Sequence, residues 1–99
     1  MACAKHLIAN NQEHWRYGVS ADVDDRTLHE IYWWPFLRSI DVRLTRTFIA
    51  DILTPPLCQA DVASVMCAYN RLNQTSSCHN GGLLTNMLRK EGGFKGRSS

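Results

Sequence analysis

Two short apolar segments, residues 2–8 and 62–69, constrain the fold of this chain more than any other feature. Lys5 and His6 lie near the end of the first segment, and the polar residues 69–71 close the second. Short apolar runs of this kind are typical of strands buried in a parallel sheet. Because parallel sheets carry their chemistry at the carboxyl ends of their strands, we expect these polar groups to meet at one edge.

Two helices are expected to connect and follow these strands. The first begins at a cap formed by Asp24 or Asp25 and is disturbed near Pro35, which has no backbone N–H to donate. Its apolar face has three- and four-residue spacing and consists of Leu28, Ile31, Tyr32 and Phe36. The second helix covers residues 83–90, and residues 94–96 begin a third strand. This alternation predicts an α/β fold with a parallel sheet.

The composition excludes several classes of protein. A chain of 99 residues makes one small domain or a piece of a larger one. Its net charge is only +2 and its basic residues form no stripe, so we expect no nucleic-acid partner. We expect no membrane association either, because no apolar stretch approaches the about 20 residues of a membrane span. The first residues, MACAKH, lack the basic and apolar regions of a signal peptide.

Four cysteines are spaced too unevenly to define a disulfide-stapled miniprotein, and they form no Cys-x-x-Cys pair for zinc. They are Cys3, Cys58, Cys67 and Cys78. The neighbouring His79 makes Cys78 a weak lead for a metal site. The triplet Asn73-Gln74-Thr75 is an N-glycosylation sequon in a polar segment. It makes Asn73 a glycosylation candidate and suits a secreted protein.

Four longer segments, two of which overlap the apolar segments above, read KHLIANNQEHWR, VDDRTLHEIYWWPF, SVMCAYNRLNQTSSCHN and LLTNMLRKEGGFKG. In this order they closely resemble the N-terminal barrel domain of fungal family 3 glycoside hydrolases, chiefly β-glucosidases. The resemblance covers nearly the whole chain except residues 42–59 and the last three. It implies a partial (β/α)8 TIM-type barrel, from about the fourth strand to the start of the sixth. It also implies hydrolysis of terminal nonreducing β-D-glucosyl residues in cellobiose, aryl glucosides and glucans.

The resemblance implies roles for five residues. Lys5 and His6 match the pair that hydrogen-bonds hydroxyls of the nonreducing glucosyl unit, and Arg16 matches an arginine of the same subsite. Met66 and Tyr69 match residues that flank the nucleophile and the sugar face. Charged donors on rigid strand ends suit a sugar, whose hydroxyls point in fixed directions. The implied partner is a β-glucoside or oligosaccharide substrate of a secreted parent enzyme, with no cofactor and no metal.

Retaining glycosidases need two carboxylates about 5 Å apart. In this family the nucleophile is an aspartate in a Ser-Asp-Trp motif after a segment like residues 93–96, and the acid/base belongs to a later domain. Six acidic residues are considered for these roles, and none matches either one; they are Glu13, Asp22, Asp24, Asp25, Glu30 and Glu91. We therefore nominate no catalytic residue and expect these 99 residues to be a fragment that is inactive alone.

Residues 42–59 interrupt the resemblance. Without them the sequence reads WWPFLRSID-ADVASVMCAYN and passes directly from helix to strand, as in the family. The ends of the segment can be encoded by codons that resemble splice sites, with Val42-Arg43 as GTACGT and Gln59 as CAG. We interpret the segment as a retained intron, and a genuine loop insertion is the alternative.

Cys67 and Cys78 bracket a ten-residue polar loop, so we expect them to pair in an oxidised parent. The same two residues, with His79, could instead serve a noncatalytic metal- or partner-binding module, which is the alternative to the glucosidase. We interpret His14, His29 and His79 as helix-surface or loop residues. The stripe of Trp33, Trp34 and Phe36 is interpreted as packing between helix and barrel.

Overall fold

The computed structural model describes residues 2–40 and 62–98. The interpretation of residues 42–59 therefore lies outside the described residues. Three strands form one sheet in the order β1-β3-β6, with both neighbouring pairs parallel. They are β1 (Cys3–Leu7), β3 (Ser64–Cys67) and β6 (Arg97–Ser98). The fold is α/β, and these three parallel strands appear in the chain order that the sequence predicts.

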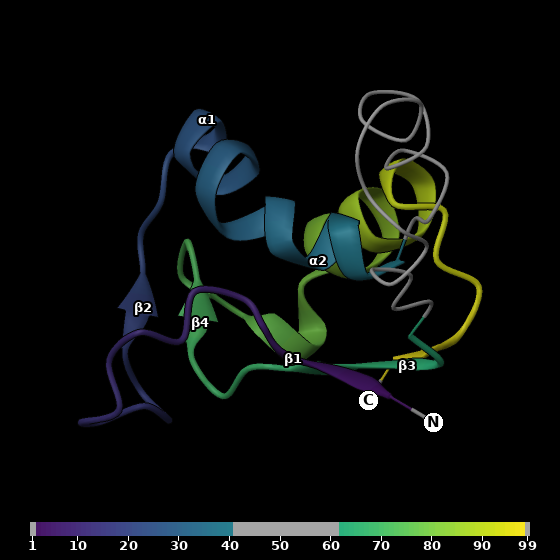
Figure 1. Ribbon diagram of the computed structural model, residues 1–99. Coiled ribbons are helices and arrows are strands. Elements are labelled where there is room, and N and C mark those ends of the chain that lie inside the picture. Colours follow the sequence, from purple (N-terminus) through teal and green to yellow (C-terminus); the bar gives the residue numbers. More distant parts are fainter. Residues whose placement is uncertain (1, 41–61, 99) are drawn as a thin grey trace, which may run out of the picture.

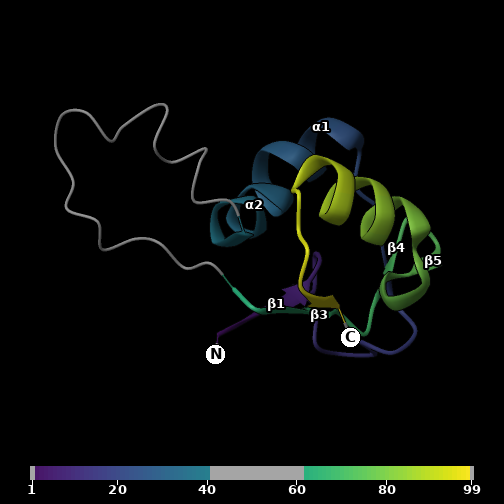
Figure 2. The same cartoon turned by 90° about the vertical axis from the view of Figure 1, so that its right-hand side faces the viewer.

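Two helical segments cover one face of this sheet (Figures 1 and 2). The first is continuous through α1 (Asp25–Thr27), η1 (Leu28–Trp33) and α2 (Trp34–Ile40). The second is η3 (Gly82–Glu91), which lies between β3 and β6 in the chain. No helix within residues 2–40 and 62–98 is long and apolar enough to cross a membrane.

The first helical segment is capped by Asp24 rather than by Asp25. The Asp24 carboxylate accepts a hydrogen bond from the Thr27 N–H at 3.0 Å, and the hydrogen bonds from Thr27 lower the pKa of Asp24. The helix is wound in a wider π-helical turn over residues 28–33, just before Pro35. Proline cannot donate to the preceding turn, and wide turns and prolines are common causes of helix distortion. The disturbance therefore lies immediately before the proline that predicted it.

This wider winding changes which side chains face the core. Leu28 and Trp33, five residues apart, are buried, whereas Ile31 is 62% exposed. A π-helix bonds residue i to residue i+5, so residues five apart lie above one another. The prediction that Ile31 lies on the core face is therefore wrong. Trp33 and Phe36 pack in or against the core as expected, but Trp34 is 51% exposed.

The second helical segment confirms the helix predicted over residues 83–90, but it too is wound as a π-helix. The N-cap residue is Gly81, and Asn80 just before it satisfies one N–H of the first turn, since Asn80 Oδ1 accepts a hydrogen bond from the Leu83 N–H at 3.1 Å. At its end, Gly92 donates to the Met87 carbonyl at 2.8 Å, the wide spacing of a π-helical turn. We find no physical cause in the sequence for the π-helical winding of this segment.

The third strand begins at Arg97, after residues 94–96 where the sequence placed its start. Phe94 is instead a buried core residue. Gly96 brings the chain so close to β3 that a Cβ atom there would lie 2.5 Å from the Ala63 carbonyl oxygen. Pairing with β3 starts at the next residue, since the Arg97 N–H donates to that same carbonyl at 3.3 Å. The close approach of glycine thus sets where the strand begins.

A second small sheet, absent from the sequence prediction, consists of β2 (Ser20–Ala21), β4 (Arg71–Leu72) and β5 (Thr75–Ser76). β2 and β4 are parallel, and β4 and β5 are antiparallel. Figure 1 shows β2 and β4 beyond the carboxyl ends of β1 and β3. The core under the helices is apolar, and its most deeply buried large side chains are Leu7, Ile8, Val65, Leu83 and Leu88.

Candidate functional site

Four of the five predicted site residues lie on or just after two neighbouring strands. Lys5 and His6 are exposed and stand inside β1, which continues to Leu7. The sequence predicts Lys5 and His6 at the end of the strand, but in the structure they lie before its end. Met66 lies in β3 and is 40% exposed, and Tyr69 follows that strand with 53% of its surface exposed. Because β1 and β3 are hydrogen-bonded parallel neighbours, their carboxyl ends point the same way.

The fifth residue, Arg16, lies on the loop after β1. It contacts Tyr69, which lies on the loop after β3. Arg16 Cζ is 5.0 Å from the centre of the Tyr69 ring and 5.3 Å from the centre of the Tyr17 ring. The two tyrosine rings are 4.8 Å apart and inclined by 46°. A guanidinium within about 6 Å of an aromatic ring is attracted to its π face. The structure thus brings Arg16 and Tyr69 together, and it adds Tyr17, which the sequence analysis missed.

A carboxylate also holds Arg16. Arg16 Nη1 donates to Glu13 Oε2 at 2.9 Å, and Asn10 Nδ2 donates to Glu13 Oε1 at 3.2 Å. The Tyr17 side chain, and after it the Glu13 carboxylate, raise the pKa of Arg16 above its ordinary value. Glu13 was also missed, although its spacing of three residues before an arginine is a signal for such a pair.

Lys5 borders a different part of the surface, a hollow that it shares with Pro35, Phe36 and Ser39 of the first helical segment. No hydrogen bond, ion pair or ring contact among the described residues joins Lys5 or His6 to Arg16 or Tyr69. A common mouth for Lys5, His6 and Tyr69 therefore stays a prediction.

A disulfide joins Cys67, the last residue of β3, to Cys78 in η2 (Ser77–His79). This is the pair that the sequence singled out, and its Cα atoms are 5.3 Å apart, within the usual range. The bond closes the loop that carries Tyr69. Since the two sulfurs are bonded to each other, neither is a thiolate ligand as the metal-binding alternative requires. Among residues 2–40 and 62–98, no group of three His, Cys, Asp or Glu side chains could hold a metal ion.

No protein-family model matches the chain. Probable β-glucosidase L of Aspergillus terreus is 45% identical over 95 residues, which are 96% of this chain and 10% of that protein. DesR, a β-glucosidase from Streptomyces venezuelae solved in complex with D-glucose, is 42% identical with a TM-score of 0.78, over 99% of this chain and 10% of that one.

The family 3 (GH3) β-glucosidase of Bifidobacterium adolescentis is 36% identical with a TM-score of 0.68, over 94% of this chain and 11% of that one. This chain belongs to glycoside hydrolase family 3. It spans about a tenth of the length of these family 3 relatives. The resemblance found in four sequence segments is thereby confirmed.

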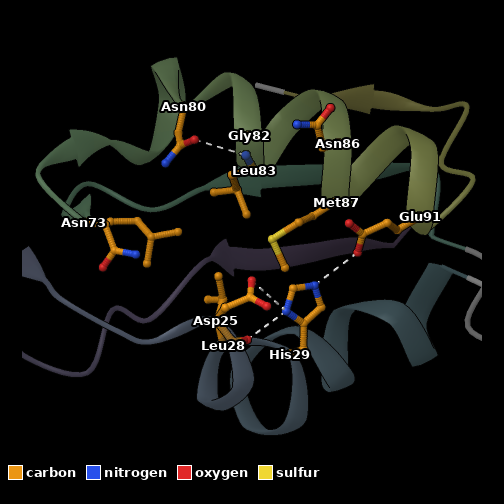
Figure 3. A pocket seen from close by; sticks show the side chains of 11 residues that line it. Asp25, Leu28, His29, Asn73, Asn80, Gly82, Leu83, Asn86, Met87 and Glu91 are labelled. Atoms are coloured by element: carbon orange, nitrogen blue, oxygen red, sulfur yellow. Dashed lines mark hydrogen bonds and ion pairs between the residues drawn. The ribbon is translucent and has the colours of Figure 1, made fainter.

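Elsewhere in the family 3 chain, a hollow of about 290 Å³ lies between the two helical segments (Figure 3). His29 Nδ1 lies 2.8 Å from the Asp25 carbonyl oxygen, and His29 Nε2 lies 3.2 Å from Glu91 Oε2. The Asp25 carbonyl and, after it, the Glu91 carboxylate raise the pKa of His29. The sequence placed His29 on a helix surface; it is part-exposed there, but it also bridges two helices.

Asn73, the glycosylation candidate, anchors the second sheet. Its Oδ1 accepts from the Val23 N–H at 2.7 Å, and its Nδ2 donates to the Val23 carbonyl at 2.9 Å. Asn73 and Gln74 form the turn between β4 and β5 with φ values of +47° and +70°. Two successive positive φ values are typical of the type I′ hairpin turn, in which asparagine is favoured. Asn73 is exposed, and its glycosylation stays a prediction.

Proposed function

We propose that this chain forms part of the glucosyl-binding site of a retaining β-glucosidase, which hydrolyses terminal nonreducing β-D-glucosyl residues. The observation that carries the proposal is the contact of the Arg16 guanidinium with the Tyr69 ring, just past two parallel strands. The resemblance to the family implies that Arg16 and Tyr69 contact the sugar. The solved relative DesR, which has glucose bound, matches nearly the whole of this chain.

The proposed chemistry follows from the side chains. The guanidinium of Arg16 offers several N–H donors in a fixed plane, which suits sugar hydroxyls with fixed directions. Lys5 and His6 add hydrogen-bond donors from β1, while Met66 and Tyr69 flank the sugar and the nucleophile. A hydroxyl beside a carboxylate nucleophile can position it for attack at the anomeric carbon.

The two catalytic carboxylates of the retaining mechanism are proposed to come from other parts of the parent enzyme. Each acidic side chain among the described residues already has a local partner. The pairs are Glu13 with Arg16, Asp22 with Gln74, Asp24 with Thr27, Asp25 and Glu91 with His29, and Glu30 with Arg26. We therefore propose that the 99 residues alone do not hydrolyse glucosides.

In the parent enzyme, we propose that β1, β3 and β6 are about the fourth, fifth and sixth strands of a (β/α)8 barrel. Their shared parallel direction and their order in the sheet support this assignment. We also propose that the parent is secreted. The Cys67–Cys78 disulfide supports this, because disulfides persist mainly in oxidising compartments.

A segment exchange tests the proposal. The part of DesR that aligns with this chain is replaced by residues 1–99, and hydrolysis of p-nitrophenyl β-D-glucoside is measured. We expect the exchanged enzyme to be active and Arg16→Ala to lower its kcat/KM about 10- to 100-fold, as expected for a lost charged hydrogen bond. Arg26→Ala is the matched control, because Arg26 pairs with Glu30 on a helix surface.

An Arg16→Ala enzyme as active as the Arg26→Ala enzyme contradicts the proposal. The 99-residue chain is assayed in parallel, and turnover above a vector control contradicts its proposed inactivity. A second exchanged enzyme that lacks residues 42–59 tests the retained-intron interpretation. We expect the shorter insert to give the more active enzyme, whereas equal activities favour a genuine loop.

A further inference from the structure

Arg16 is held from two sides, and on each side one of its partners, Glu13 or Tyr17, has no role in the proposed function. On one side, the Glu13 carboxylate accepts from Nη1 at 2.9 Å. On the other, the guanidinium lies over the Tyr17 and Tyr69 rings, which contact each other. A long arginine side chain at the surface has many rotamers, and fixing it requires partners that restrict them. Arg16 has such partners on both sides.

The Glu13 carboxylate is itself fixed. Its second oxygen accepts a hydrogen bond from Asn10 Nδ2 at 3.2 Å, so the contacts run in series from Asn10 through Glu13 to Arg16. A carboxylate with both oxygens engaged keeps one orientation and offers the arginine a fixed acceptor. Surrounding groups of this kind are what hold a binding constellation in place.

Tyr17 owes its place to a tight turn rather than to burial, since 69% of its surface is exposed. Trp15 has a φ of +59°, and its carbonyl accepts from the Gly18 N–H at 2.8 Å and the Val19 N–H at 3.0 Å. A non-glycine residue with positive φ is uncommon and concentrates at functional sites. The Arg71 N–H then donates to the Val19 carbonyl at 2.9 Å, which ties this loop to the segment after Tyr69.

We propose that Glu13 and Tyr17 are positioning residues, which hold the Arg16 guanidinium and the Tyr69 ring in the geometry that binds a glucosyl unit. This inference rests on the proposed function, because it takes Arg16 and Tyr69 as sugar contacts. Glu13 restricts the guanidinium through its carboxylate, and Tyr17 restricts it through its ring while packing against Tyr69. Neither residue needs to touch the sugar.

The test uses the exchanged enzyme described above, in which residues 1–99 replace the aligned part of DesR, and it measures inhibition of p-nitrophenyl β-D-glucoside hydrolysis by D-glucose. The inhibition constant reports glucose binding, and thermal unfolding of each variant reports whether the fold is intact. We expect Glu13→Ala and Tyr17→Ala to weaken glucose binding about three- to fivefold, the range for an exposed ion pair or cation–π contact. Tyr17→Phe keeps the ring and Glu13→Gln keeps an acceptor, so each should recover part of the loss.

Glu30→Gln is the matched control, since Glu30 forms an exposed ion pair with Arg26 on a helix. Glucose binding that is unchanged in folded Glu13→Ala and Tyr17→Ala overturns the positioning roles while the proposed function stands. An Arg16→Ala exchanged enzyme that binds D-glucose as tightly as the unaltered exchanged enzyme overturns the proposed function, and the positioning roles with it. Equal losses in Tyr17→Phe and Tyr17→Ala overturn the role of the Tyr17 ring.

Discussion

His29 Nε2 lies 3.2 Å from Glu91 Oε2, although the two residues are 62 positions apart in the chain. His29 belongs to η1 and Glu91 ends η3, so this contact joins the two helical segments (Figure 3). The other ring nitrogen faces the Asp25 carbonyl oxygen at 2.8 Å. With an oxygen at each nitrogen, the doubly protonated imidazolium can donate on both sides, which the neutral ring cannot.

The His29 contacts predict that stability falls as pH rises through neutrality. The pKa of His29 is raised above 6.5 in the folded chain, first by the Asp25 carbonyl and then by Glu91. The stabilisation is therefore complete below the unfolded pKa and is lost as pH rises through the folded pKa. Because His29 is part-exposed, the effect should stay below about 1 kcal/mol. Urea unfolding between pH 5.5 and 8.5 measures it.

The same experiment on His29→Gln should give a flatter dependence of unfolding free energy on pH. Glu91→Gln should lower the His29 pKa, which an NMR titration of its ring protons reports. His79→Gln is the control, because His79 forms no ion pair among the described residues. An identical pH dependence in His29→Gln and the unaltered chain would contradict the bridge between the helices.

The Cys67–Cys78 disulfide predicts a large loss of stability on removal. Closing a loop of this size restricts the unfolded chain by about 3 kcal/mol, so Cys67→Ser with Cys78→Ser should lower the free energy of unfolding by about that amount. Cys3→Ser is the control, since Cys3 is free and exposed and should change stability by less than about 0.5 kcal/mol. Chemical denaturation under non-reducing conditions compares the three proteins.

The parallel sheet could be predicted because its signals are local and strong. The apolar runs around β1 and β3 and the capped helix after Asp24 each carry a pattern of their own. The second sheet carries none, because β2, β4 and β5 have two residues each. Side-chain amides hold it, with Asn73 bonded to Val23 and Gln74 bonded to Asp22. Contacts between residues about fifty positions apart leave no periodic trace in the sequence.

The candidate site, like the fold, contains some residues that could be predicted from the sequence and others that could not. Arg16 and Tyr69 could be identified from their resemblance to a family, and they do come into contact. Tyr17 could not, since an exposed tyrosine on a loop has no pattern that separates it from any other. Its position depends on the positive φ of Trp15 and on the bond between Val19 and Arg71, both of which are tertiary features.

Replacing Asn73 should lower the stability of the fold, whether or not Asn73 carries a glycan. Asn73→Ala removes both hydrogen bonds to Val23 and puts alanine at a φ of +47°, so we expect a loss of about 2 kcal/mol in unglycosylated chain made in bacteria. Thr75→Ala destroys the sequon but leaves both bonds, so its stability should change little. In a glycosylating host, a mass increase on the unaltered chain that both variants lack would support glycosylation of Asn73. Equal stability of the two variants in bacteria would contradict the anchoring role.

Adding a single methyl group at Gly96 should clearly lower the free energy of unfolding. A Cβ atom at Gly96 would lie 2.5 Å from the Ala63 carbonyl oxygen and 2.6 Å from Phe94 Cζ, and neither the backbone that leads into β3 nor the buried ring can move away freely. Overpacking of this kind typically destabilises by 1–3 kcal/mol, so Gly96→Ala should lower the free energy of unfolding by about 2 kcal/mol. Gly81→Ala is the matched control, because a Cβ there meets nothing within 4 Å and its φ of −63° suits alanine. That variant should be unchanged or more stable by about 0.5 kcal/mol, since alanine restricts the unfolded chain. Thermal and urea unfolding of the two variants decide the matter, and similar stabilities would show that β6 does not pass β3 as closely as Gly96 requires.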